Sequence, residues 1–314
     1  MPGTHEPNTG IAAGAVATPP LPPMELLTRI GRTPEGDDET REFFERSGRA
    51  RKRAIVDALP AGYSFEGRTV LDFGCGAGRV LRHFLQEASS ADFMGCDLHA
   101  PTIEWLSQNL APPMRFFVND TRPMPLPDAS VDLVYALSVF THITHDWSDW
   151  LLELHRLLKP DGLLLATFMG SSTWERAAQR PLDPDELGMA VLGLHRELTD
   201  TSGPVVLHSP WWLEEHWGRA FEILSIQSNG FLVPGKGHGV VLARKRDVDL
   251  STDDLEWPNP NDRRELVAQR TQVVLLEQNA GRLRRQMKRQ GSRPQPKGRG
   301  GLPSSLRRRG LRDA

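Results

Sequence analysis

The chain has few cysteines and no long apolar stretch. Two cysteines, Cys75 and Cys96, occur in 314 residues, without the spacing of a disulfide framework or of metal ligands. We therefore expect no metal site and a reducing, cytoplasmic environment. No segment approaches the roughly 18 apolar residues of a membrane-spanning helix, and no charged region followed by an apolar run opens the chain. We accordingly expect neither a membrane span nor a signal peptide.

The formal net charge of −2 conceals two regions of opposite charge. Residues 262–314 hold 15 Lys and Arg against 4 Asp and Glu, whereas the other 261 residues hold 23 against 36. An acidic region disfavours non-specific binding of nucleic acid, and a basic tail attracts anionic partners. The tail is therefore a candidate for contact with a nucleic acid, an acidic protein or a membrane surface. The alternative is a solvated tail without a partner.

Changes in composition divide the chain into five parts. They are a disordered or lid-like lead-in (1–39), a central domain (40–246), an acidic linker (247–262), a helical segment (263–290) and a disordered basic tail (291–314). The helical segment has an apolar seven-residue repeat, typical of a coiled coil. One position holds Leu266, Val273, Ala280 and Met287, and the other holds Gln269, Leu276, Leu283 and Gln290. The segment is thus a candidate for homodimerisation or for docking on a partner.

Short apolar runs alternate with helical segments in the central domain. Strands are predicted at 69–73, 93–97, 114–118, 131–137, 163–168, 221–228 and 239–244; helices are predicted at 42–59, 80–88, 102–110, 146–158 and 210–220. Continuous apolar strands are typical of a sheet covered on both faces. The pattern therefore predicts an α/β fold with a doubly wound, mostly parallel, seven-stranded sheet that ends in an antiparallel hairpin. Residues 171–208 are expected to form an irregular or partly helical insertion, and 159–162 a tight turn.

A glycine turn follows the first predicted strand. Gly74, Gly76 and Gly78 leave no side chain between the backbone and a ligand. Asp97 comes 19 residues after Gly78, at the end of the second strand, where an acid can bind a ribose. The spacing differs from the dinucleotide fingerprint, whose third glycine comes one position later, and no Gly-Lys-Ser/Thr completes a P-loop. These residues predict a ligand that contains a nucleoside.

Five motifs, in order over residues 40–245, resemble class I S-adenosylmethionine (SAM)-dependent methyltransferases. They are Asp72-Phe73-Gly74-Cys75-Gly76-Ala77-Gly78-Arg79, Asp97-Leu98, Val118-Asn119-Asp120, Asp128-Ala129-Ser130-Val131-Asp132-Leu133-Val134 and Leu157-Leu158-Lys159-Pro160-Asp161-Gly162-Leu163. The resemblance implies a Rossmann-like fold with SAM as cofactor. It is looser at Pro22-Pro23-Met24-Glu25-Leu26, which is similar to lead-ins of bacterial small-molecule and saccharide methyltransferases.

The resemblance also implies roles for single residues. Asp72 would hold the methionine end of SAM, and Asp97, with Leu98 beside it, would bind the ribose hydroxyls. Asp120, next to Asn119, would meet the adenine amino group. The remaining expected contacts are the turn residues Gly74, Cys75, Gly76 and Gly78, and Ser138 and Phe140 in the methyl-donor pocket.

His142 is the candidate catalytic residue, because it follows the fourth strand and a histidine there can take a proton from the acceptor. Alternatively, it borders the next helix and alignment of the reactants suffices. After this strand the chain lacks the Asn/Asp-Pro-Pro-Tyr/Phe motif of adenine N6 and glutamine methylation.

The sequence thus predicts methyl transfer to an O or N atom of a small-molecule or saccharide acceptor. The alternatives are a non-catalytic scaffold that acts through its coiled coil and tail, and a nucleic-acid methyltransferase anchored by the tail.

Overall fold

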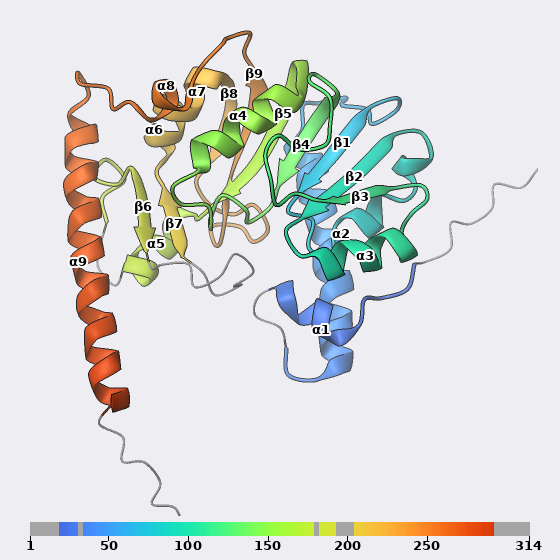
Figure 1. Cartoon of the computed structure of the whole chain (residues 1–314), viewed down its shortest axis with the longest axis horizontal. Coiled ribbons are helices and arrows are strands. Elements are labelled where there is room, and N and C mark those ends of the chain that lie inside the picture. Colours follow the sequence, from blue (N-terminus) through green and yellow to red (C-terminus); the bar gives the residue numbers. More distant parts are fainter. Residues whose placement is uncertain (1–18, 31–33, 179–181, 193–203, 292–314) are drawn as a thin grey trace, which may run out of the picture. The chain divides into compact units, whose positions relative to one another are not determined.

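The structure, a computed structural model, describes residues 19–30, 34–178, 182–192 and 204–291 (Figure 1). The chain up to Leu276 forms one compact unit, and the residues from Glu277 onward form a second. The predicted basic tail at 291–314 lies, apart from Gly291, outside the described residues, as does most of the predicted disordered lead-in.

A seven-stranded sheet has the order β3-β2-β1-β4-β5-β9-β8. Its strands are β1 (Thr69–Phe73), β2 (Asp92–Asp97), β3 (Arg115–Val118), β4 (Val131–Ala136), β5 (Leu158–Phe168), β8 (Phe221–Gln227) and β9 (Gly239–Lys245). Neighbours among β1 to β5 pair in parallel, whereas β9 is antiparallel to both β5 and β8. The predicted seven-stranded, mostly parallel α/β sheet is confirmed.

Helices cover both faces of the sheet (Figure 1). The described helices are α1 (Met24–Leu27), α2 (Asp37–Ala58), α3 (Ala100–Asn109), α4 (Trp147–Leu157), α5 (Ser171–Ala178), α6 (Pro210–Trp212), α7 (Gly218–Ala220), α8 (Thr252–Glu256) and α9 (Arg263–Gly291), of which α2, α3, α4 and α6 pack in the cores of the sheet. Along β1, Leu71 and Phe73 pack in a core with α4 and α6, while Val70 packs in a second core with α2 and α3. This alternation follows from the two-residue period of a strand, and it explains the continuous apolar runs in the sequence.

Three local predictions differ from the structure. The helix expected at 80–88 is two short 3₁₀ segments, η2 (Leu81–Phe84) and η3 (Glu87–Ser89), neither of which has a side-chain N-cap hydrogen bond. The turn at 159–162 lies inside β5, where Asp161 has φ +60° and the pairing with β4 shifts register. The insertion contains an antiparallel pair, β6 (Met189–Leu192) with β7 (Val205–His208), which the sequence analysis did not anticipate.

The described part of the lead-in packs over the glycine turn. Leu26 and Leu27 are buried in a cluster with Phe44 and Ala77. Arg82 donates to the carbonyl oxygens of Pro19 and Pro20 at 2.7 and 3.0 Å. The N-terminal segment therefore covers the turn with apolar side chains and is tied to it by one arginine.

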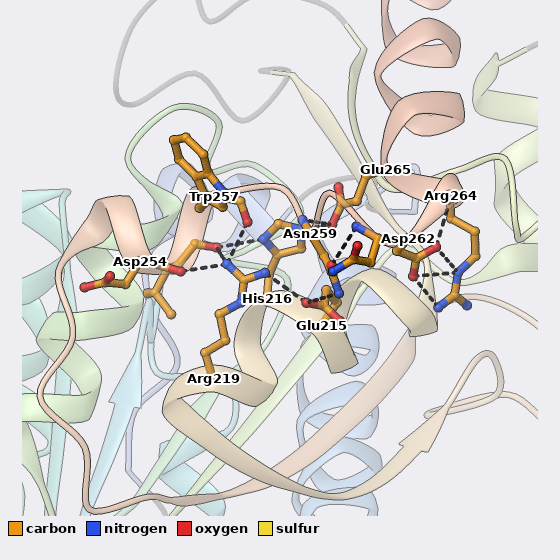
Figure 2. Close-up of polar contacts among 11 residues, drawn as sticks. Glu215, His216, Arg219, Asp254, Trp257, Asn259, Asp262, Arg264 and Glu265 are labelled. Atoms are coloured by element: carbon orange, nitrogen blue, oxygen red, sulfur yellow. Dashed lines mark hydrogen bonds and ion pairs between the residues drawn. The ribbon is translucent and has the colours of Figure 1, made fainter.

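The acidic linker and the start of α9 are fixed to the sheet domain by a polar cluster on the helical segment 210–220 (Figure 2). His216, which is buried, has Nδ1 2.7 Å from the carbonyl oxygen of Leu255 and Nε2 3.0 Å from the Glu265 carboxylate. Arg219 donates to the carbonyl oxygens of Asp254 and Trp257 at 2.6 and 2.7 Å. The linker predicted at 247–262 thus has a defined path that includes α8.

The part of α9 before Glu277 packs through a face other than the predicted heptad. Ala268 and Leu275 are buried, whereas Leu266 and Val273, at heptad positions, are 54% and 55% exposed. Glu265 and Gln272 add polar contacts on the packed side, to His216 and to the backbone N–H of Val191. This part of α9 therefore packs against the rest of its own unit through residues other than those of the predicted coiled-coil repeat.

Candidate functional site

The glycine turn is held in place by the end of β2. The backbone N–H groups of Gly74 and Cys75 both donate to the carbonyl oxygen of Cys96, at 2.9 and 2.8 Å. Gly74 has φ +80°, and a Cβ there would lie 2.5 Å from Val139 Cγ2. At Gly76 a Cβ would meet no atom within 4 Å. Gly74 is therefore required by the backbone and by close packing, while Gly76 presents bare backbone to open space.

A cavity of about 440 Å³ lies in front of this turn, at the carboxyl ends of β1, β2 and β4. The chain runs from β1 outward to β2 and β3 on one side, and then crosses back to β4 on the other side of β1. Open α/β sheets bind ligands at such a switch point. The predicted site residues that line the cavity are Asp72, Gly74, Cys75, Gly76, Asp97, Leu98, Asn119, Ser138 and His142.

Three predicted site residues do not line the cavity. Phe140 is 1% exposed and packs in the core, with its ring centroid 4.6 Å from that of Trp217. At Gly78 a Cβ would lie 2.5 Å from Leu106 Cδ2, so this glycine allows close packing on α3. Asp120 is exposed to solvent. Some residues of the glycine turn and of the segment after β4 therefore pack in the protein interior, while their neighbours line the cavity.

Asn119, the neighbour of Asp120, points into the protein instead. Its side chain is 4% exposed and lines the cavity, and Oδ1 has no hydrogen-bond partner among the described residues. A buried acceptor without a partner is costly, about 1–3 kcal/mol, unless a ligand or water supplies a donor. Asn119 is therefore the group after β3 that is placed to accept from a bound molecule.

Asp97 is fixed by two backbone donors. Its Oδ2 accepts from the N–H of Gly76 and its Oδ1 from the N–H of His99, both at 2.9 Å. Each carboxylate oxygen keeps further acceptor capacity. The carboxylate thus faces the cavity in a set orientation, with two oxygens available to a pair of hydroxyl donors.

Asp72 is a buried acid at the end of β1, only 3% exposed. Burial raises the pKa of its carboxyl to about 8; the nearby Tyr135 hydroxyl opposes this shift and the Asp97 carboxylate adds to it. A cation placed in the cavity would favour the ionised form. The acid is therefore suited to a positively charged ligand and is costly without one.

Cys75 lines the turn with a buried thiol. Burial raises the pKa of the Cys75 thiol well above its usual value, and the neighbouring Asp72 carboxylate raises it further. A protonated, buried thiol is a poor nucleophile. At Gly95 on β2 a Cβ would lie 3.0 Å from Cys75 Sγ, so the thiol fills space against that strand.

Ser138 and His142 form the wall of the cavity beyond β4. Ser138 Oγ lies 3.2 Å from Thr141 Oγ1 and 3.4 Å from His238 Nε2. His142 Nδ1 lies 2.9 Å from the carbonyl oxygen of Pro204, which can only accept. In a neutral His142 ring the proton is therefore on Nδ1, and Nε2 carries the lone pair.

Sequence reasoning missed several groups that line the same cavity. They include Arg29, Arg51, Arg79 and Trp150. Trp150 Nε1 donates to Asp146 at 3.1 Å, and its indole lies under the Arg122 guanidinium, 4.8 Å from ring centroid to Cζ. Trp150 is buried, at 9% exposed, and forms part of the cavity wall. Of these residues, only Arg79 could have been assigned to the cavity from the sequence, because it directly follows the glycine turn.

Two further observations concern the described residues alone. In the parts of the chain that the structure describes, no group of three or more His, Cys, Asp or Glu side chains could hold a metal ion. Among these same residues, no helix has both the length and the apolar character required to cross a membrane.

Comparisons with known proteins point to one family. A family model described as a methyltransferase domain matches residues 71–166. A Mycolicibacterium smegmatis protein named "probable S-adenosylmethionine-dependent methyltransferase" is 31% identical over 140 residues, covering 44% of this chain and 52% of that protein. The fatty-acid O-methyltransferase of the same organism is 31% identical over 124 residues, covering 37% of this chain and 44% of the relative.

A third relative matches more of the chain at lower identity. The malonyl-[acyl-carrier protein] O-methyltransferase of Enterobacter lignolyticus is 27% identical over 194 residues, covering 59% of this chain and 69% of the relative. A crystal structure of a SAM-dependent methyltransferase from Mesorhizobium loti has a TM-score of 0.49 at 17% identity, covering 62% of this chain and 98% of that one.

The matched region coincides with the site. Residues 71–166 contain β2 to β4, most of β1 and of β5, the glycine turn and the acids at the strand ends. The chain spans about half the length of the first two relatives. With the family match, the strand order and the cavity on the same residues, the chain contains a class I SAM-dependent methyltransferase domain.

Proposed function

We propose that this protein is an enzyme that transfers a methyl group from SAM to an O or N atom of a small-molecule acceptor, leaving S-adenosylhomocysteine (SAH). The observation that supports it best is the cavity at the switch point of the sheet, where Asp72, Asp97 and the bare turn at Gly76 converge. A cofactor that joins a charged amino acid to a nucleoside needs these groups in this order.

The residues present fit SAM group by group. Asp97 accepts from the two ribose hydroxyls, because its carboxylate is already oriented by Gly76 and His99. Asp72 accepts from the ammonium of the methionine part. The partnerless Oδ1 of Asn119 accepts from the adenine amino group. This assignment moves the adenine contact from Asp120, which the resemblance implied, to the adjacent amide.

SAM supplies a methyl group on a positively charged sulfur, so that the C–S bond breaks with its electron pair going to sulfur as the acceptor's lone pair forms the new bond. The chain's own contribution is alignment and exclusion of water. Ser138 and His142 form the wall beside the reacting position. His142, with Nε2 as its acceptor nitrogen, takes the proton of a hydroxyl or amine acceptor.

Oxygen is the better-supported acceptor atom. Two of the reported relatives, the fatty-acid enzyme of Mycolicibacterium smegmatis and the malonyl-[acyl-carrier protein] enzyme of Enterobacter lignolyticus, are named as O-methyltransferases. A saccharide hydroxyl is compatible with the same chemistry. The competing idea of a non-catalytic scaffold is disfavoured, because a buried Asp72 and an Asn119 Oδ1 without a partner among the described residues would then cost stability without purpose.

The test is methyl transfer from SAM that carries a tritiated methyl group. The protein is incubated with a small-molecule extract, a saccharide fraction and total RNA in separate reactions. We expect label in a small-molecule or saccharide product with the natural chain and none with Asp97→Ala. Label only in RNA, or no Asp97-dependent label in any fraction, would refute the proposal.

A further inference from the structure

Two of the arginines that line the cavity form no direct ion pair with a described residue, although Asp72, Asp97 and Asp146 line the same cavity. Arg51, from α2, and Arg79, directly after the glycine turn, both line it. Arg82 nearby pairs with Glu45 at 2.7 Å. For Arg51 the hydrogen bond found is to the carbonyl oxygen of Ser47 at 3.1 Å. Neither Arg51 nor Arg79 forms an ion pair with a carboxylate of the residues that the structure describes.

Helix α2, which carries Arg51, packs closely against the backbone of Arg79. A Cβ at Gly48 would lie 2.1 Å from the carbonyl oxygen of Arg79, so the helix touches the backbone at this point. Arg51 follows Gly48 by one helical turn. Burial, and then the charge of Arg51, lower the pKa of Arg79 to about 9. Two partly buried like charges are stable together only when an anion compensates them.

The cofactor provides one anion, its methionine carboxylate. Asp72, before the glycine turn, and Arg79, directly after it, both line the cavity, so Arg79 is a candidate to bind this carboxylate. Arg51 acts in addition on His238, whose pKa is lowered by burial, by Arg51 and by His142. His238 contacts Ser138 across 3.4 Å. Arg51 lines the same cavity as Ser138 and His142, which form the wall beside which the acceptor is proposed to bind.

We propose that Arg51 binds an anionic oxygen group of the methyl acceptor. The acceptor class is accordingly a carboxylic acid or a phosphate ester. This inference rests on the function proposed above and narrows its substrate. A guanidinium offers two parallel N–H donors, the geometry that carboxylates and phosphates both accept.

The test uses the full chain saturated with SAH, at constant ionic strength, titrated with sodium acetate and separately with sodium phosphate. Tryptophan fluorescence follows binding, since Trp150 lines the cavity. We expect saturable binding of at least one anion. Arg51→Gln should weaken it about tenfold or more, because a charge-assisted hydrogen bond contributes about 1.5–3 kcal/mol. The Kd of SAH should change less than about twofold in that variant.

Two further variants control for charge and for folding. Arg53→Gln removes the same charge from an exposed position of α2, and it should leave both Kd values unchanged. Arg51→Lys keeps the charge, and it should retain most of the anion affinity. Preferred binding of acetate indicates a carboxylic acid acceptor, and preferred binding of phosphate indicates a phosphate ester.

Three results would overturn the proposal, and they are distinguishable. Loss of SAH binding in Arg51→Gln by tenfold or more would assign Arg51 to the cofactor carboxylate. Saturable binding of neither anion by the natural chain, or equal anion affinity in Arg51→Gln, would remove the acceptor site. Failure of the natural chain to bind SAH, seen before any anion is added, would instead refute the proposed function on which this site depends.

Discussion

Replacing Asp72 by Asn should stabilise the protein without ligand and weaken its binding of SAM. Asn has the same shape as Asp and does not titrate. In the folded chain, burial raises the pKa of the Asp72 carboxyl from 3.8 to about 8. The stability that this group contributes is therefore fully present below about pH 4 and is lost as the pH rises through 8.

The size of the effect follows from the shift. Between about pH 4 and 8 the unfolded chain releases the proton and the folded chain keeps it, so the free energy of unfolding falls by about 1.4 kcal/mol per pH unit from this group. Asp72→Asn lacks this slope. Its stability relative to the natural chain should therefore rise by about 3 kcal/mol between pH 5 and pH 7.

Urea unfolding at pH 5, 6, 7 and 8 measures the difference in the free energy of unfolding between Asp72→Asn and the natural chain. The other titrating groups are present in both proteins, so their contributions cancel in this difference. Asp120→Asn makes the same chemical change at an exposed acid and should show no such trend. Saturating SAM should flatten the slope of the natural chain, since the cofactor's positive charge favours the carboxylate. A stability difference between Asp72→Asn and the natural chain that is independent of pH without ligand would refute a buried, proton-holding Asp72.

Three other predictions concern the site and the C-terminal attachment. Asn119→Ala should raise the Kd of SAM about tenfold, as expected for one lost hydrogen bond, whereas Asp120→Ala should change it less than about twofold. Calorimetry that shows the larger effect in Asp120→Ala would assign the adenine contact to Asp120. Gly78→Ala should lower the free energy of unfolding by about 2 kcal/mol through its clash with α3 and its φ of +72°, and unchanged urea stability would contradict that packing role. Glu265→Ala should cost about 3 kcal/mol because it leaves a buried histidine without its partner, while the exposed Glu214→Ala should be neutral; equal stability of the two variants would show that the buried pair is unimportant.

The sheet could be predicted from the sequence because its determinants are local. Strands β1 to β4 are short, largely apolar runs, and motif residues lie at the carboxyl ends of β1, β2 and β3, where the parallel arrangement gathers them. Asp72, Asp97 and Gly76 therefore reach one cavity even though other elements separate them in sequence.

Other features depend on tertiary contacts that no spacing encodes. Arg51 lies on a helix with charged residues on most sides, and its direction is set by the contact of Gly48 with the turn. The choice between Asn119 and Asp120 depends on which of two adjacent side chains turns inward at the end of β3. The heptad in α9 is genuine in the sequence, yet burial of Leu275 selects another face for packing on the domain.

The central claim is that the cavity at the glycine turn binds SAM through Asp97. Isothermal titration calorimetry with SAM tests it most directly, on the natural chain and on Asp97→Ala. The account predicts a one-to-one complex with the natural chain and a Kd at least about 100-fold weaker in Asp97→Ala, since two hydrogen bonds to a charged acceptor are lost. No heat of binding at millimolar SAM, or equal affinity in the two proteins, would contradict it.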